Sequence, residues 1–126
     1  MWHAVLVGIG GFIGSVLRYW LSGLAQRGFP GDFPVGTLLV NIVGCLAIGA
    51  FWSLVEYRAW FSPEQRIFVT VGVLGGFTTF SAFGYETFML MRDSEYLPAL
   101  ANVLANTLVG MAAVALGWMA AKALAI

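Results

Sequence analysis

Near the middle of the chain stands Gly75-Gly76-Phe77-Thr78-Thr79-Phe80-Ser81-Ala82-Phe83, inside a stretch that otherwise reads as a membrane-spanning helix. Paired glycines loosen a helical backbone, and threonine and serine hydroxyls offer that backbone competing hydrogen bonds. Irregular backbone at membrane depth is tolerated only where it is buried in protein or lines a cavity. The sequence therefore predicts a broken membrane helix at this point, with an ion site at the break.

The composition around this stretch is that of a membrane protein. Of the 126 residues, 60% are hydrophobic and 10% are charged, whereas a soluble domain carries about 25% charged residues. The mean hydropathy is +0.89. A net charge of zero gives no reason to expect a nucleic-acid partner. No Ser-His-Asp set, metal-ligand cluster or phosphate loop indicates an enzyme, and the lone Cys45 is interpreted as a packing residue.

Charges divide the chain into four apolar stretches, each long enough to cross a bilayer as a helix. We expect spans over about residues 2–24, 33–55, 64–91 and 96–121, with the break in the third. Membrane-spanning strands would need about ten alternating residues each, and no segment shows that alternation. The predicted fold is an all-α membrane protein with four transmembrane helices in one domain over residues 1–126.

The positive charges are almost evenly divided between the two sides that four spans would create. Arg58, Arg66 and Lys122 share the side of the termini. The other side has Arg27 and Arg92, joined by Arg18 if that side chain snorkels toward the first loop. Positive charge normally fixes topology. Either a small protein simply carries few charges, or the chain inserts in both orientations and pairs antiparallel with itself. Four short helices enclose little volume for a pathway, which independently favours a dimer.

Two polar stripes accompany the break. Asn41 lies four residues after Thr37 and therefore on the same helical face, and Asn102 and Asn106 repeat this spacing on the last span. A side-chain amide donates two hydrogen bonds, either to an anion or to a neighbouring helix as interhelical glue. Both interpretations stay open for each asparagine alone. Two stripes beside a broken helix favour a pathway.

Four further side chains are candidates for a site or for packing. Phe80 and Phe83 are three residues apart, so they project to similar sides of a helix and either pack in the core or present electropositive ring edges to an anion. Glu86 follows by another three residues, and an intramembrane acid is a functional candidate by default. Arg18 is either an interior anchor or a mouth residue that attracts anions.

Three ordered motifs carry a resemblance to a known family. They are Gly10-Gly11-Phe12-Ile13-Gly14 with Arg18-Tyr19, then Gly36-Thr37-Leu38-Leu39-Val40-Asn41-Ile42-Val43-Gly44, then the stretch from Gly75 to Ser81 with Phe83 and Glu86. The fourth span, with Asn102, Asn106 and Gly110, agrees more loosely. Across essentially the whole chain, these motifs resemble the Fluc (CrcB) fluoride channels of microbial membranes. Ala82 departs from that pattern, because the family commonly has threonine or serine there.

The resemblance implies a fluoride-selective channel that exports fluoride passively and reduces its toxicity in the cytoplasm. It further implies an antiparallel dual-topology homodimer, surrounded by lipid in the bacterial inner (plasma) membrane. The implied fluoride pore comprises Asn41, Phe80, Phe83, Thr37, Ser81 and Thr79. Backbone carbonyls of Gly75 and Thr78 from both subunits would hold a structural sodium ion, Na⁺, at the dimer centre. Arg18, Glu86, Asn102 and Asn106 would be vestibule or structural residues, and a hydroxyl missing at Ala82 would slow conduction if that position lines the pore.

Two other functions fit a small four-helix membrane protein. A proton-coupled small multidrug exporter needs a titratable acid in its first span, but Met1 to Gln26 contains neither Asp nor Glu. Proton coupling would then fall to Glu86, which makes this function the weaker expectation. A non-transporting membrane assembly subunit, whose glycine faces merely pack helices, is the third candidate.

Overall fold

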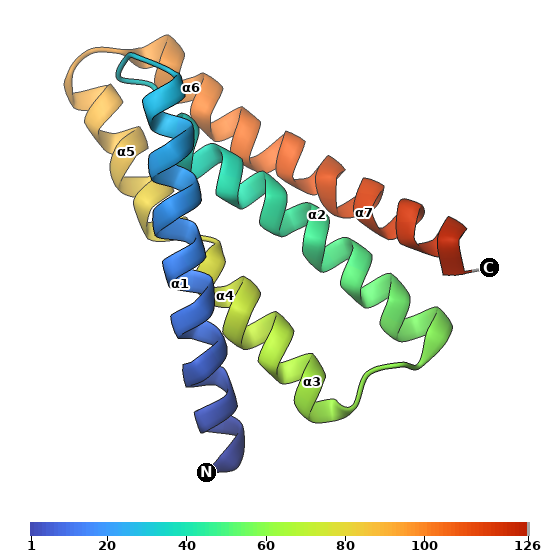
Figure 1. The fold of residues 1–126 in the computed structure, drawn as a ribbon. Helices are drawn as coiled ribbons and strands as arrows, with labels where there is room; N and C mark the ends of the chain where they lie inside the picture. Colours follow the sequence, from blue (N-terminus) through green and yellow to red (C-terminus); the bar gives the residue numbers. More distant parts are fainter. Residues whose placement is uncertain (126) are drawn as a thin grey trace.

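The computed structural model of the protein describes residues 1–125, and these form an all-helical chain (Figure 1). Four helical spans are long and apolar enough to cross a membrane, which confirms the predicted number. They are Trp2–Gly28, Val35–Arg58, Pro63–Arg92 and Tyr96–Ala125. The first, second and fourth spans end three or four residues later than expected from the apolar stretches, the second begins two residues later, and the third is one residue longer at each end.

The first two spans are the continuous helices α1 (Trp2–Gly28) and α2 (Val35–Arg58). Gln26 fastens the loop between them. Its Nε2 donates to the Phe33 carbonyl at 3.1 Å, and its Oε1 accepts a hydrogen bond from the Gly36 N–H at 3.1 Å. The end of α1 therefore satisfies one of the backbone donors that the start of α2 leaves unpaired.

The third span consists of four pieces, α3 (Pro63–Ile67), the π-helical segment η1 (Phe68–Leu74), α4 (Gly75–Phe77) and α5 (Phe80–Arg92). Only Thr78 and Thr79 leave the helical conformation, with φ/ψ of −87°/160° and −149°/117°. The predicted break is confirmed, but it is narrower than the nine-residue stretch suggested. Gly75 and Gly76 are helical, and the break arises at the two threonines that follow Phe77.

The fourth span contains α6 (Tyr96–Leu104), a second π-helical segment, η2 (Ala105–Val109), and α7 (Gly110–Ala125). Neither π-helical segment was predicted from the sequence. Such segments are rare and frequently occur at functional sites. Here one of them carries Asn106, and the other ends at Leu74, just before the broken part of the third span.

Two closely packed pairs of helices make up the fold in Figure 1. α2 and α7 run side by side, and α1 lies along the third span against η1 and α4. Glycine permits these approaches: a Cβ atom at Gly14 would overlap the Val73 carbonyl, and one at Gly117 would overlap the Leu46 carbonyl. Small residues let helix backbones approach closely in a membrane. Because α4 contacts both α1 and α2, the break lies where the two pairs meet.

Candidate functional site

The break at Thr78–Thr79 divides the third span into two half-helices with unpaired backbone groups. The Leu74 carbonyl accepts hydrogen bonds from the Thr78 N–H at 3.0 Å and the Thr78 hydroxyl at 3.1 Å. The carbonyls of residues 75 to 78 then stand at a helix C-terminus, where no helical donor follows. On the other side, the Thr79 hydroxyl caps α5 by accepting from the Ala82 N–H at 3.2 Å. The break thus joins a partially negative helix end to a partially positive helix start.

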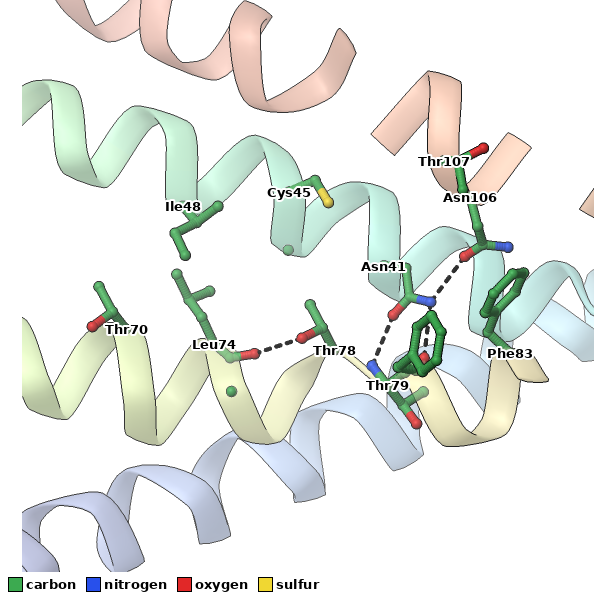
Figure 2. Close-up of a pocket in the computed structure, with 13 residues that line it drawn as sticks. Asn41, Cys45, Ile48, Thr70, Leu74, Thr78, Thr79, Phe83, Asn106 and Thr107 are labelled. Carbon is green, nitrogen blue, oxygen red and sulfur yellow. Dashed lines mark hydrogen bonds between the residues drawn. The ribbon is translucent and has the colours of Figure 1, made fainter. Parts of the chain in front are cut away.

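Asn41 holds the broken backbone from α2 (Figure 2). Its Oδ1 accepts a hydrogen bond from the Thr79 N–H at 2.8 Å, and its Nδ2 donates to the Thr79 carbonyl at 3.0 Å. The remaining N–H of the amide donates to Asn106 Oδ1 at 2.9 Å. Asn41 therefore lies at the break, and both of its N–H donors are engaged within the chain.

Asn102 and Asn106 continue this network along the fourth span. Asn106 Nδ2 donates to the Asn102 carbonyl at 3.0 Å and to Asn102 Oδ1 at 2.9 Å. Asn102 Nδ2 donates to the Thr87 hydroxyl at 3.0 Å, which in turn donates to the Phe83 carbonyl at 2.7 Å. The network therefore leaves the third span at Thr79 and returns to it in α5.

Phe80 and Phe83 border a pocket of about 370 Å³ beside Asn41. Their ring centroids are 5.5 Å apart, and the rings are tilted by 55°, so they lie on one side of α5 as their spacing predicts. Phe83 is 9% exposed, whereas Phe80 is 83% exposed. The remaining lining residues come from α2, the third span and η2; they are Gly44, Cys45, Ile48, Thr70, Leu74, Gly75, Thr78, Thr79, Asn106 and Thr107.

A second pocket, of about 540 Å³, lies on the α1 side of the break. Most of its lining residues carry a hydroxyl group, and one carries a guanidinium; they are Ser15, Arg18, Tyr19, Ser22, Thr37, Val40, Thr79, Ser81 and Ala82. Arg18 Nη1 donates to the Thr78 carbonyl at 3.3 Å, which anchors the guanidinium at the break. Ala82 belongs to this pocket and does not line the one beside Phe80 and Phe83.

Glu86 forms a separate contact next to this second pocket. The Thr37 hydroxyl donates to Glu86 Oε1 at 2.7 Å, and Thr37 itself is 8% exposed. Glu86 Oε2 is buried and has no hydrogen-bond partner among residues 1–125. The polar face of α2 therefore holds two points of the third span, Thr79 through Asn41 and Glu86 through Thr37.

The structure distributes the predicted site residues over two pockets. The pocket beside the phenylalanines contains Asn41, Phe80, Phe83, Gly75, Thr78 and Asn106, and the second pocket contains Thr37, Ser81 and Arg18. Thr79 lines both pockets, whereas Glu86 and Asn102 line neither. Sequence reasoning missed Thr87, whose position four residues after Phe83 was the available signal. It also missed that Cys45, four residues after Asn41, faces the first pocket.

Metal-binding side chains do not gather at this site. Within the part of the chain that the structure describes, no three His, Cys, Asp or Glu residues come together as a possible metal site. The oxygen atoms near the break belong to backbone carbonyls, to the hydroxyls of Thr78, Thr79 and Ser81, and to the amides of Asn41 and Asn106. Unwound carbonyls at half-helix ends are the groups that coordinate sodium in several transporters.

Known proteins resemble this chain over nearly its whole length. Residues 5–118 match the family described as CrcB-like protein, Camphor Resistance (CrcB). A protein of Methanosarcina acetivorans named fluoride-specific ion channel FluC 1 is 49% identical over 125 residues, which cover 99% of this chain and 95% of the relative. Proteins named fluoride-specific ion channel FluC from Nitratidesulfovibrio vulgaris and Pyrococcus abyssi are 42% and 44% identical, over 93% and 94% of this chain and 94% of each relative. This chain belongs to the CrcB-like protein family.

Proposed function

We propose that this protein is a fluoride-selective ion channel that exports fluoride passively across the membrane and so lowers fluoride toxicity in the cytoplasm. The observation that carries the proposal is the break at Thr78–Thr79, which lies beside the Asn41 amide and the paired rings of Phe80 and Phe83. The identity of the transported ion is inferred from the relatives that are named as fluoride-specific ion channels.

The chemistry of the site suits a small, strongly hydrated anion. A pore must replace the water shell of such an ion with converging donors and positive partial charges. Amide and hydroxyl donors gather near the break in Asn41, Thr79 and Ser81, and phenylalanine edges add weakly positive contacts. Arg18 and the N-terminal end of α5 add positive charge without a mobile lysine in the path.

A second copy of the chain would complete the site. Phe80 borders the first pocket yet is 83% exposed, and Gly75 at the half-helix end is exposed as well. An antiparallel partner covering this face would bury both residues and enclose the pathway, which four short helices cannot do alone. Both orientations in the plasma membrane agree with the even division of positive charge between the two sides.

The oxygen atoms at the break are of the type that would bind a structural sodium ion in such a dimer. The Gly75 and Thr78 carbonyls end a half-helix, so each chain would offer two oxygen atoms and a pair would offer four. A bound cation would supply a fixed positive charge near an anion path. The Arg18 guanidinium already contacts the Thr78 carbonyl, so this oxygen would serve two cations and Gly75 would be the less encumbered ligand.

Electrogenic fluoride release from liposomes tests the proposal. Vesicles that contain the purified protein and potassium fluoride should release fluoride only after valinomycin carries the balancing potassium. Replacing sodium by a large organic cation should lower the rate, because the dimer loses its central ion. Valinomycin-independent release driven by a proton gradient would favour a coupled exporter, and absence of any release would favour a non-transporting subunit.

A further inference from the structure

The direction of every hydrogen bond in the asparagine network is fixed by backbone groups. The Thr79 N–H can only donate, so Asn41 must present Oδ1 to it and Nδ2 to the Thr79 carbonyl. The Asn102 carbonyl can only accept, so Asn106 must present Nδ2 to it and leave Oδ1 for Asn41. Both asparagines thus have one allowed orientation, and each orientation supports the other.

Asn106 matters to Asn41 because it holds the second N–H of that amide. Without an acceptor at Asn106 Oδ1, this N–H would lack its partner in the ion-free chain, and only the two hydrogen bonds to Thr79 would still hold the Asn41 amide. The hydrogen bonds by which Asn41 fixes the Thr79 peptide at the start of α5, directly before Phe80, would then be less firmly positioned. An anion at Asn41 would have to compete for an N–H that is already engaged.

We propose that Asn106, itself oriented by Asn102, is a positioning residue that fixes the amide of Asn41 and, through it, the broken backbone at Thr79. The consequence for transport rests on the proposed fluoride channel, but the positioning itself is independent of it. In such a channel, a fluoride ion at Asn41 would compete with Asn106 Oδ1 for this N–H. The π-helical segment η2, which carries Asn106, is the local backbone feature that distinguishes this position from the rest of the span.

A role in packing and a role in positioning predict different relative effects for substitutions at Asn102 and Asn106. Asn102 is 1% exposed, whereas Asn106 is only partly buried, so a packing role would make Asn102 the more sensitive site. Positioning through Asn41 makes Asn106 the more sensitive one, because only Asn106 touches Asn41. Removing the Asn102 side chain still leaves its backbone carbonyl to orient Asn106.

Amide hydrogen exchange at Thr79 in the full-length dimer tests the proposal without any fluoride measurement. Asn106→Leu should accelerate this exchange about tenfold, as expected for the loss of a hydrogen bond that holds a locally opening segment. Asn102→Leu should have a smaller effect, and Ser53→Ala, which removes a buried hydroxyl without a hydrogen-bond partner, should have none. Fluoride release should fall in the same order.

Two results would overturn the proposal. One is a larger effect of Asn102→Leu than of Asn106→Leu on Thr79 exchange, which packing would produce. The other is faster exchange throughout the chain with no excess at Thr79, which indicates general destabilisation. If Thr79 exchange follows the proposed order while no variant and no wild-type protein transports fluoride, the positioning role stands and the channel function fails.

Discussion

At the scale of single residues, the site depends on side chains of α2 that hold the broken third span by hydrogen bonds. Asn41 brackets the Thr79 peptide, and Thr37, one helical turn earlier, donates to Glu86. A hydrogen bond to a charged group contributes about 1.5–3 kcal/mol. Glu86 Oε2 is buried without a partner among residues 1–125, so loss of the Thr37 hydroxyl would leave the carboxyl group without any hydrogen bond, which is costly in a desolvated site.

Thr37→Val should therefore reduce fluoride release by up to about tenfold, which corresponds to about 1.4 kcal/mol appearing in the transport barrier. Valine has the shape of threonine but cannot donate to Glu86. Thr37→Ser keeps the hydroxyl and should stay within about twofold of the wild type by the same measure. Initial rates from a fluoride electrode on matched vesicles provide the comparison, and equal rates for the valine and serine variants would remove this hydrogen bond from the account.

At the scale of elements, the sequence predicted the four helices because charge-free stretches of about 20 residues have few other stable structures in lipid. It predicted the break from the same stretch, because glycine and threonine disfavour a continuous helix. The sequence suggested a break of nine residues, whereas only Thr78 and Thr79 leave the helix. Gly76 remains helical and lies where a Cβ atom would come within 2.6 Å of the Gly11 carbonyl, so packing against α1 explains this glycine and chain flexibility does not.

The rest of the site depends on contacts between distant segments. No local sequence pattern predicts that Arg18 donates to the Thr78 carbonyl or that Asn41 donates to Asn106, because these pairs are 60 and 65 residues apart. The π-helical segments are similarly invisible, since their residues fit an ordinary helix. The resemblance to a family named the candidate residues, but it did not separate them into two pockets.

Packing of α1 on the third span gives a prediction at this scale. Gly14→Ala should destabilise the protein by about 1–3 kcal/mol, the usual cost of overpacking, because the added methyl group overlaps the Val73 carbonyl. Gly8→Ala is the matched change on the same helix, where nothing lies within 4 Å of the new atom. Thermal unfolding in detergent should therefore separate the two variants. Equal melting temperatures would show that α1 does not pack on η1 as described.

At the scale of the whole molecule, the main feature is that a single chain leaves part of its proposed pathway uncovered. Phe80 at the pocket rim is 83% exposed, and large apolar side chains cover much of the remaining exterior. In a membrane these side chains face lipid or another protein. The balanced positive charge and the exposed half-site together favour two copies in opposite orientations.

Charge variants test this arrangement. Asp32→Lys with Glu95→Lys adds positive charge to one side, and Glu56→Lys with Glu64→Lys adds it to the other. Each pair should fix a single orientation and abolish fluoride release when expressed alone, because positive charge directs insertion. Co-expression of the two should restore release. Full activity of either pair alone, with its orientation verified by labelling, would contradict an antiparallel dimer.

The most direct test of the central claim is simultaneous measurement of fluoride and chloride release from the same vesicles, loaded with both ions and reconstituted with wild-type protein or Asn41→Leu. A fluoride-selective channel should release fluoride rapidly and retain chloride in the vesicles with wild-type protein. The Asn41→Leu variant should release fluoride far more slowly while remaining a folded dimer. Fluoride and chloride leaving the wild-type vesicles at equal rates, or neither ion leaving, would contradict the central claim.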